Sequence, residues 1–233
     1  ATGSVRSTLA EAKAIGAELD GNPFLDTELV TFVAGDADMS VSTITASPDT
    51  VVAGGGSIST VTVTVLDAEG NPVSGAVVTL FAAPGANTIT QPAVTGASGV
   101  ATGTVASTEA GTKTVSATIN GQDLSSTYDV VFIPGDVDLS LSEVSVDRTE
   151  ITADGTDEVT VTVTVRDSSG NPVPGVSVLI TATGSENDIT QPVGGTNENG
   201  IAVGSVRSTA AEAKTIGAEF DGNPFLDTEL VTF

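Results

Sequence analysis

The side chains in this sequence that could do chemistry are carboxylates. The 233 residues include 30 Asp and Glu but no histidine and no cysteine, and the formal net charge is -23. Nucleophilic catalysis through a Ser–His or Cys–His pair is therefore excluded, as are imidazole and thiolate metal ligands. Two carboxylates can hydrolyse glycosides, but only where a cleft sets their spacing. Nothing in the sequence indicates such a cleft, so we expect no catalytic residues and no enzymatic activity.

Pairs of aspartates recur where turn residues interrupt the apolar pattern. Val33-Ala-Gly-Asp-Ala-Asp38 reappears one hundred residues later as Ile133-Pro-Gly-Asp-Val-Asp138. In a β-sandwich, two other connections return to the end at which the chain enters: the one between the second and third strands, and the one between the last two. Acidic residues should meet there, and two carboxylates about 4 Å apart repel by roughly 4 kcal/mol at an effective dielectric constant near 20.

A bound calcium ion would turn this repulsion into attraction, because calcium is coordinated by oxygen ligands and needs neither nitrogen nor sulfur. The alternative is that these aspartates cap turns and stay solvated, and their spacing matches no EF-hand. Calcium is the one cofactor that these acids suggest, and its candidate ligands are Asp36, Asp38, Asp67, Glu69, Asp136, Asp138, Asp167 and Asp221.

The stretch that must position these acids occurs twice. Residues 60–75 and 160–175 are identical at 12 of 16 positions, and each begins with the pair Thr-Val three times over. This alternation places the valines on one face of a half-buried strand and the threonines on the other. The Asp, Gly, Asn and Pro that follow favour a tight connection before the next β-rich run.

The repeat is about one hundred residues long. One complete copy covers residues 35–134 and a second covers 135–233, whereas residues 1–34 match only the C-terminal part of a copy. Residues 1–32 differ from residues 202–233 at four positions only. We interpret residues 1–34 as the tail of an incomplete repeat, which cannot close a core and should pack on a neighbour.

Each complete copy is expected to contain seven short strands at roughly ten-residue spacing, the pattern of an immunoglobulin-like sandwich. The first copy should have strands at 39–46, 58–66, 73–82, 87–90, 99–106, 112–119 and 122–132, and the second copy should repeat them. Asn120-Gly121, like Asp20-Gly21 and Asp221-Gly222, predicts a two-residue hairpin turn. The predicted fold class is all-β, with tandem immunoglobulin-like sandwiches arranged end to end.

Some side chains are assigned to the core or to solvent. The core should consist of Val, Ile, Leu and Ala with an occasional phenylalanine, such as Phe81, Phe132 and Phe233. Three lysines, Lys13, Lys113 and Lys214, occupy one equivalent position. A Lys–Asn isopeptide crosslink there would need an apolar site with a buried acid, and the flanking residues are small and polar. We therefore interpret these lysines as solvated.

At this point the motifs resemble a known family. The Val-Thr strand is followed by Asp-x-x-Gly-Asn-Pro-Val-x-Gly (residues 67–75 and 167–175), then by Ser98-Gly99-Val-Ala or Asn199-Gly200-Ile-Ala. Together with Ser107-Thr-Glu-Ala-Gly111, these motifs are similar to the bacterial Ig-like domain of the intimin and invasin type. The resemblance covers both complete copies and residues 1–34. It implies tandem domains that form a stalk and hold an adhesive tip away from the bacterial surface.

The resemblance and the repeats together predict a structural stalk or spacer module of a repetitive surface adhesin or filament, extracellular and non-catalytic. Its partners would be neighbouring identical repeats or chains, and a host or cell-surface receptor would be bound by parts outside this segment. Two alternatives stay open. One is a ligand-binding or receptor-binding Ig-like module in cell adhesion, and the other is a self-assembling filament subunit in which another chain completes residues 1–34.

Charge and hydropathy exclude two further classes of partner. The chain has seven Lys and Arg in total and they form no cluster. Nucleic-acid binding depends on clustered basic residues, so no nucleic acid is expected as a partner. The sequence also contains no run of about eighteen apolar residues, so no part of this segment should insert into a membrane.

Overall fold

The computed structural model describes residues 2–233, which contain strands and turns and no helix. The all-β prediction is confirmed. The chain separates into two compact units, and each is described by itself. Unit 1 consists of Ala1–Val51, Gly55–Ser107 and Gly111–Phe132, and unit 2 of Val52–Gly54, Thr108–Ala110 and Ile133–Phe233.

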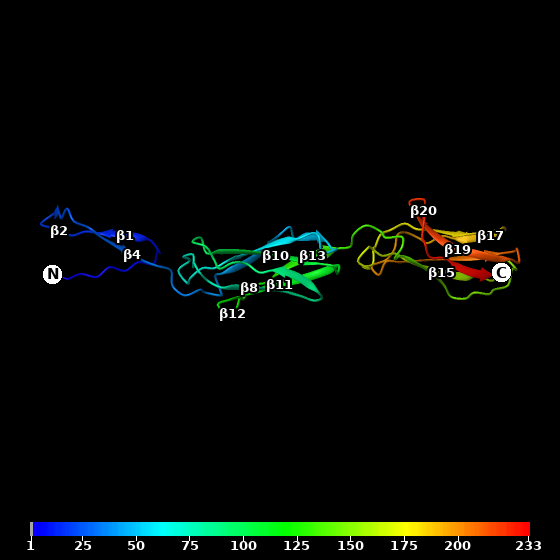
Figure 1. The fold of residues 1–233 in the computed structure, drawn as a ribbon, viewed down its shortest axis with the longest axis horizontal. Helices are drawn as coiled ribbons and strands as arrows, with labels where there is room; N and C mark the ends of the chain where they lie inside the picture. Colours follow the sequence, from blue (N-terminus) through cyan, green and yellow to red (C-terminus); the bar gives the residue numbers. More distant parts are fainter. Residues whose placement is uncertain (1) are drawn as a thin grey trace. The chain divides into compact units, whose positions relative to one another are not determined.

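Unit 1 contains a sandwich of two sheets (Figure 1). Its first sheet has the order β5 (Thr43–Ser47), β7 (Ser59–Thr64), β10 (Val100–Ser107), β9 (Asn87–Thr90). The second has the order β12 (Gln122–Asp123), β11 (Gly111–Ile119), β13 (Tyr128–Ile133), β6 (Thr50–Val52), and β8 (Val78–Ala83) pairs with β11 as well.

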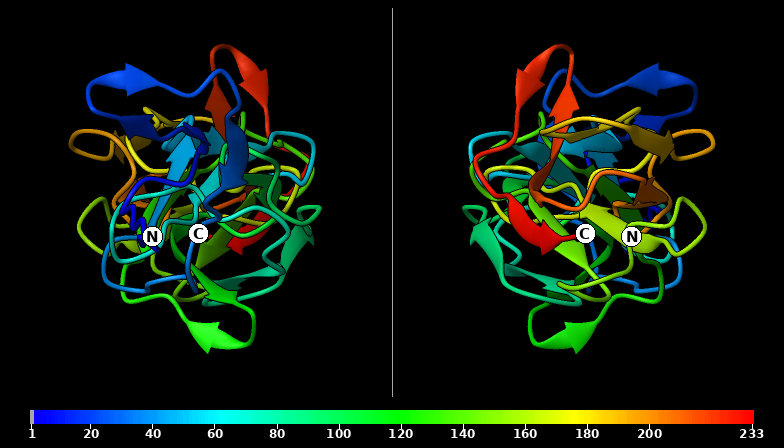
Figure 2. Two further views of the ribbon diagram at one scale, coloured as in Figure 1. Left: turned by 90° about the vertical axis from the view of Figure 1, so that its left-hand side faces the viewer. Right: turned by 90° about the vertical axis from the view of Figure 1, so that its right-hand side faces the viewer.

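Unit 2 repeats this arrangement. One sheet has the order β14 (Glu143–Val146), β15 (Val159–Thr164), β18 (Ile201–Ser208), β17 (Asn187–Thr190). The other contains β16 (Leu179–Ala182), β19 (Ala213–Phe220), β20 (Asn223–Pro224), with β21 (Glu229–Thr232) also on β19. In each unit a short hairpin arm, ending in β12 or in β20, projects from its own sandwich (Figure 2).

The Val/Thr alternation forms the strands it predicts. Val61, Val63 and Val65 are all 0% exposed. The equivalent residues of unit 2 are 0% exposed as well: Val161 and Val163 in β15, and Val165 just after it. The hairpin turns also form as expected, because Asn120 and Gly121 have φ of 51° and 83° and the two Asp-Gly turns have similar values. Only residues that tolerate positive φ can occupy both central positions of such a turn.

Residues 2–34 fold into two small pairs of strands in unit 1. β1 (Ala12–Ile15) pairs with β4 (Glu28–Thr31), and β2 (Glu18–Leu19) pairs with β3 (Asn22–Pro23). Phe24 is 55% exposed, whereas its equivalent in unit 2, Phe225, is 3% exposed. The difference arises because β1 and β4 form a two-stranded sheet of their own within residues 2–233, without the facing sheet that unit 2 provides.

Two expectations about side chains are wrong. Phe81 does not belong to the core, because it is 49% exposed while Phe132 is 1% exposed. The lysines are not solvated as a group, because Lys113 and Lys214 are buried. The Lys214 Nζ donates to the Ser185 carbonyl at 2.7 Å and to Glu212 Oε1 at 2.5 Å, and these two acceptors replace the water that a lysine loses on burial.

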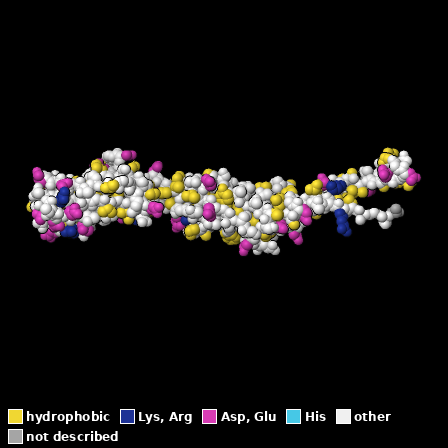
Figure 3. All heavy atoms as spheres, turned by 180° about the vertical axis from the view of Figure 1, so that it is seen from behind, with side chains coloured by type: hydrophobic (Ala, Val, Ile, Leu, Met, Phe, Trp, Pro, Cys, Tyr) yellow, Lys and Arg dark blue, Asp and Glu magenta, His cyan; other side chains and the backbone are white. Residues whose placement is uncertain are grey.

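The acidic residues are spread over the surface. On the face drawn in Figure 3, Asp and Glu side chains are scattered between neutral ones, and Lys and Arg are few. Two negatively charged surfaces repel one another, so this distribution limits sticking between neighbouring molecules. Within residues 2–233, no helix is long and apolar enough to cross a bilayer.

Candidate functional site

Each unit contains a buried acid in the connection that follows its Val/Thr strand. The connection consists of residues 67–71 in unit 1 and 167–171 in unit 2, and we call it the Asp–Asn loop. The N–H of Asp67 donates to the Asn71 carbonyl at 2.9 Å, and Gly70, at φ +84°, donates back to Asp67 at 3.0 Å. Both the aspartate and the asparagine are buried, at 2% and 8% exposure in unit 1 and 1% and 8% in unit 2.

The buried carboxylate is saturated with hydrogen bonds. In unit 2, Asp167 accepts the N–H groups of Gly135 at 2.8 Å, Ser169 at 2.9 Å and Asn171 at 2.8 Å, and the Asn171 Nδ2 at 2.9 Å. Asp67 accepts the equivalent four donors in unit 1, beginning with Gly35 at 2.8 Å. A charge buried in this way is tolerated because donors replace its water.

These donors lower the pKa of both carboxyl groups. For Asp67 the side chain of Asn71 contributes most, because its amide stabilises the ionised form. For Asp167 burial is the largest effect and raises the pKa, but the hydrogen bonds from Asn171, Gly135 and Ser169 outweigh it. Both aspartates are therefore ionised at neutral pH.

The asparagine of the loop binds the backbone of a second segment in the same unit. Asn71 Oδ1 accepts the Ala10 N–H at 2.9 Å, and its Nδ2 donates to the Thr8 carbonyl at 2.9 Å. In unit 2, Asn171 makes the same two bonds to Ala110 and Thr108, at 2.8 and 2.9 Å. Both bound segments read Thr-x-Ala, and we call them the Thr-x-Ala segments.

The carboxamide acts in this contact as the edge of a peptide group. It presents one acceptor and one donor side by side, as a neighbouring β-strand would, to an alanine N–H and a threonine carbonyl. The aspartate fixes which way the amide points, because its carboxylate accepts the second Nδ2 hydrogen and would repel the amide oxygen. The arrangement therefore holds a backbone segment in place.

Two further predicted acids, Asp38 and Asp138, lie outside the Asp–Asn loops, and each accepts hydrogen bonds from a nearby serine. Asp38 Oδ1 accepts the N–H and the hydroxyl of Ser40 at 2.8 and 2.6 Å, and Asp138 binds Ser140 in the same way. Ser40 lowers the pKa of Asp38, and Ser140 lowers that of Asp138, where the nearby charge of Asp167 opposes the effect. Asp138 thus lies near Asp167, as expected for acids at this end of the sandwich.

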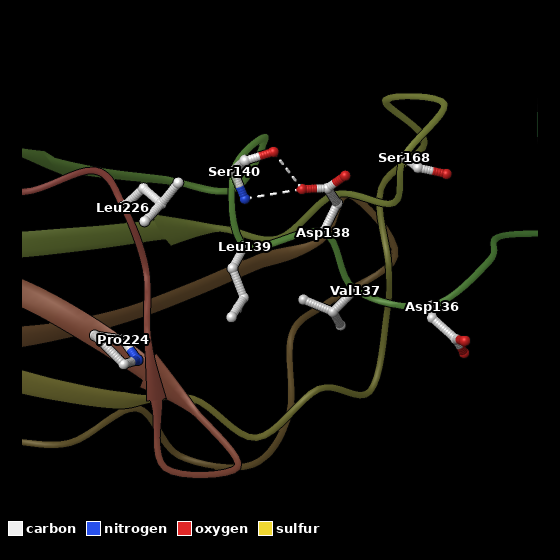
Figure 4. A pocket seen from close by; sticks show the side chains of 8 residues that line it. All are labelled: Asp136, Val137, Asp138, Leu139, Ser140, Ser168, Pro224 and Leu226. Carbon is white, nitrogen blue, oxygen red and sulfur yellow. Dashed lines mark hydrogen bonds between the residues drawn. The ribbon is translucent and has the colours of Figure 1, made fainter.

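The remaining predicted acids are exposed. Asp136 and Asp138 line an open hollow of about 590 Å³ in unit 2, and their carboxylates do not point toward one another (Figure 4). Pro224 and Leu226, beyond the β19–β20 turn that contains Asp221, line the same hollow. The acids on the surface are Asp36, Glu69, Asp136 and Asp221.

Within residues 2–233 no three Asp or Glu side chains gather into a group that could hold a metal ion. Calcium also accepts backbone carbonyl and amide oxygens. The calcium assignment therefore stays a prediction.

Sequence reasoning missed the asparagines and the segments they bind. It identifies Asn71 and Asn171 only as turn residues of the Gly-Asn-Pro motif, and it uses Ser107-Thr-Glu-Ala-Gly111 only as a family motif, with no contact assigned to it. A signal was available, because Thr-x-Ala occurs at equivalent positions as Thr8-Leu-Ala, Thr108-Glu-Ala and Thr209-Ala-Ala. The pairing of the two motifs was not visible, since 61 residues or more separate the bonded partners.

We expect acid to weaken the Asp–Asn loops. A carboxyl whose pKa is lowered by folding stabilises the fold fully above its ordinary pKa, 3.8 for Asp, and this contribution is lost as pH falls through the lower folded value. The free energies of unfolding in urea of the chain and of an Asp67→Asn, Asp167→Asn double variant should differ clearly at pH 7, and the difference should shrink as the pH falls below 3.8. A difference between them that does not change with pH would contradict the prediction.

Comparison with known proteins gives these features a context. The model of the bacterial Ig-like domain (group 1) matches twice, at residues 41–133 and 141–233. The curated inverse autotransporter adhesin YeeJ of Escherichia coli strain K12 is 33% identical over 241 residues, which is all of this chain and 10% of that protein. The chain thus spans about a tenth of the length of this relative.

Solved structures show the same fold. A crystal structure of invasin, described as a bacterial integrin-binding protein, matches with a TM-score of 0.70 and 23% identity over 96% of this chain and 46% of that one. InvD of Yersinia pseudotuberculosis matches with a TM-score of 0.63 and 26% identity over 84% of this chain and 58% of that one. The predicted tandem immunoglobulin-like sandwiches are confirmed, and the chain, matched by the family model over most of its length, belongs to the bacterial Ig-like domain (group 1) family.

Proposed function

We propose that this chain is a spacer segment of a bacterial surface adhesin, in which each repeat holds the end of the repeat before it through the Asp–Asn loop. It would carry no catalytic activity and would lie outside the cell. The relative YeeJ is named an adhesin, which supports a role of this chain in an adhesin.

The observation that carries the proposal is the duplication of one contact. Asn71 with Thr8 and Ala10, and Asn171 with Thr108 and Ala110, use the same atoms at distances that agree within 0.1 Å. The buried aspartate also accepts the N–H of Gly35 or Gly135, in the segment that leads into each complete repeat. One carboxylate therefore ties together the loop, the incoming chain and the asparagine that holds the Thr-x-Ala segment.

A spacer works by length and by stiffness. A sandwich with strands of about ten residues at roughly 3.3 Å per residue, with its loops, adds on the order of 40 Å. Stiffness requires that the joint be fixed, and a bidentate contact made by a preoriented side chain loses little entropy on forming.

Small-angle X-ray scattering of the full chain tests the proposal. We expect a maximum dimension of at least about 80 Å for the two complete repeats, at the length per repeat derived above. Replacing both asparagines, in an Asn71→Ala, Asn171→Ala variant, should broaden the distance distribution. Asn199→Ala is the matched control, because Asn199 is exposed and, among residues 2–233, its side chain has no hydrogen-bond partner; its backbone N–H donates to Asn197 Oδ1.

The outcomes separate the candidate functions. A compact, folded-back particle would contradict the spacer and favour the receptor-binding module. Concentration-dependent growth of the particle would favour the filament subunit. Repeating the measurement with calcium and with a chelator tests the predicted ligands among the surface acids, because a calcium-stiffened joint should become more flexible in the chelator.

A further inference from the structure

A third Thr-x-Ala segment, Thr209-Ala210-Ala211, lies between β18 and β19 in unit 2. Thr209 and Ala211 are exposed. Among residues 2–233, no partner donates to the Thr209 carbonyl and none accepts the Ala211 N–H. These are the two backbone groups that the asparagine binds in the other two segments.

The third segment shares a serine turn with a bound one. The Ala210 N–H donates to Ser208 Oγ at 3.1 Å, and in the bound segment of unit 1 the Leu9 N–H donates to Ser7 Oγ at 3.0 Å. This short serine turn sets the direction of the next N–H and of the preceding carbonyl. The shared turn therefore preorganises the receiving backbone at this point.

We propose that Thr209–Ala211 is a docking site for the Asp–Asn loop of a further repeat of the type found at residues 35–132. This inference rests on the proposed spacer function, and it identifies which part of the next repeat binds Thr209–Ala211. The type of repeat follows from the sequence, because residues 202–233 differ from residues 1–32 at only four positions. The Thr-x-Ala segment of residues 1–32 is the one that Asn71 binds.

The chemistry of the site defines its occupant. The receiving groups are backbone atoms, and the contact forms with either Leu9 or Glu109 as the middle residue, so Ala210 at that position is compatible with it. The occupant must carry an asparagine whose amide is oriented by a buried aspartate four residues earlier, as in Asp67 to Asn71. A lone surface asparagine lacks that orientation and would lose more entropy on binding.

Amide hydrogen exchange measured by NMR tests the docking site. The chain would be compared with one extended after Phe233 by a copy of residues 33–132, a join that reproduces the natural one because Phe32 precedes Val33. In the extended chain the Ala211 N–H should exchange at least about tenfold more slowly than in the unextended chain. This is the factor expected for one stable hydrogen bond. Ala10 and Ala110 should be protected in both chains.

Substitutions in the appended copy identify the partner group. Alanine at the position corresponding to Asn71 should restore fast exchange at Ala211, and glutamine there should do the same because one extra methylene displaces the amide. The Ala210 N–H, which is bonded internally, should not change in any chain.

Fast exchange at Ala211 in the extended chain, with Ala10 and Ala110 protected, would overturn the inference. The spacer function would survive that result if scattering still showed an extended particle. Loss of protection at Ala10 and Ala110 as well would instead remove the contact on which both proposals rest.

Discussion

Replacing Asp167 with alanine should lower the free energy of unfolding by about 2–4 kcal/mol. The substitution leaves the N–H groups of Gly135, Ser169 and Asn171 without the acceptor that they share. Each buried donor that loses its partner costs about 1–3 kcal/mol, and relaxation of the loop toward water recovers part of the sum. Urea-induced unfolding followed by circular dichroism measures the change.

The control for this prediction is Asp136→Ala. Asp136 is an exposed aspartate in the segment that leads into the same repeat, so its removal should change the free energy by less than about 0.5 kcal/mol. Equal effects of the two substitutions would show that the Asp–Asn loop does not depend on its carboxylate. The exchange rate of the Ala110 N–H adds a local readout, because Asn171 loses its orienting partner and should release that N–H.

Replacing Phe132 with alanine should lower the free energy of unfolding by about 3–5 kcal/mol, the usual cost of removing a large core side chain. Phe132 lies on β13 opposite Gly111 of β11 and is 1% exposed. Its removal leaves a cavity between two sheets whose other side chains are mostly small. The sole tyrosine, Tyr128, lies on the same strand, so its fluorescence follows unfolding of this sandwich.

Phe81→Ala gives the matched comparison in the same unit. Phe81 lies on β8 and is 49% exposed, so the substitution should cost no more than about 1 kcal/mol. A larger cost for Phe81 than for Phe132 would mean that the two sheets pack through the opposite face of β8.

Local patterns in the sequence were enough to predict much of the fold. The Val/Thr alternation places Val61 and Val63 in the core, since neighbouring side chains of a strand point to opposite faces. Asn120-Gly121 adopts the predicted turn because positive φ is a property of those residues themselves. Strands β9 and β17 begin and end where they were expected, at residues 87–90 and 187–190.

Strand ends were predicted less well, because they depend on partners. The strand expected at 73–82 begins only at Val78, since Pro72 forms a bridge to Leu66 and Gly75 takes φ of 80°. The strand expected at 122–132 is divided into β12 and β13. The three residues of β6 were not predicted at all, because so short a strand forms only through its pairing with β13.

The amino-acid sequence by itself determined the all-β class, the hundred-residue repeat and the absence of histidine and cysteine chemistry, because each is a property of composition or of local spacing. Only the tertiary structure decided that Lys214 is buried and that Asn71 holds Thr8 and Ala10. Those contacts join residues far apart in the chain, and the groups that Asn71 binds are backbone atoms. Every residue carries such atoms, so no side-chain pattern marks them before the chain has folded.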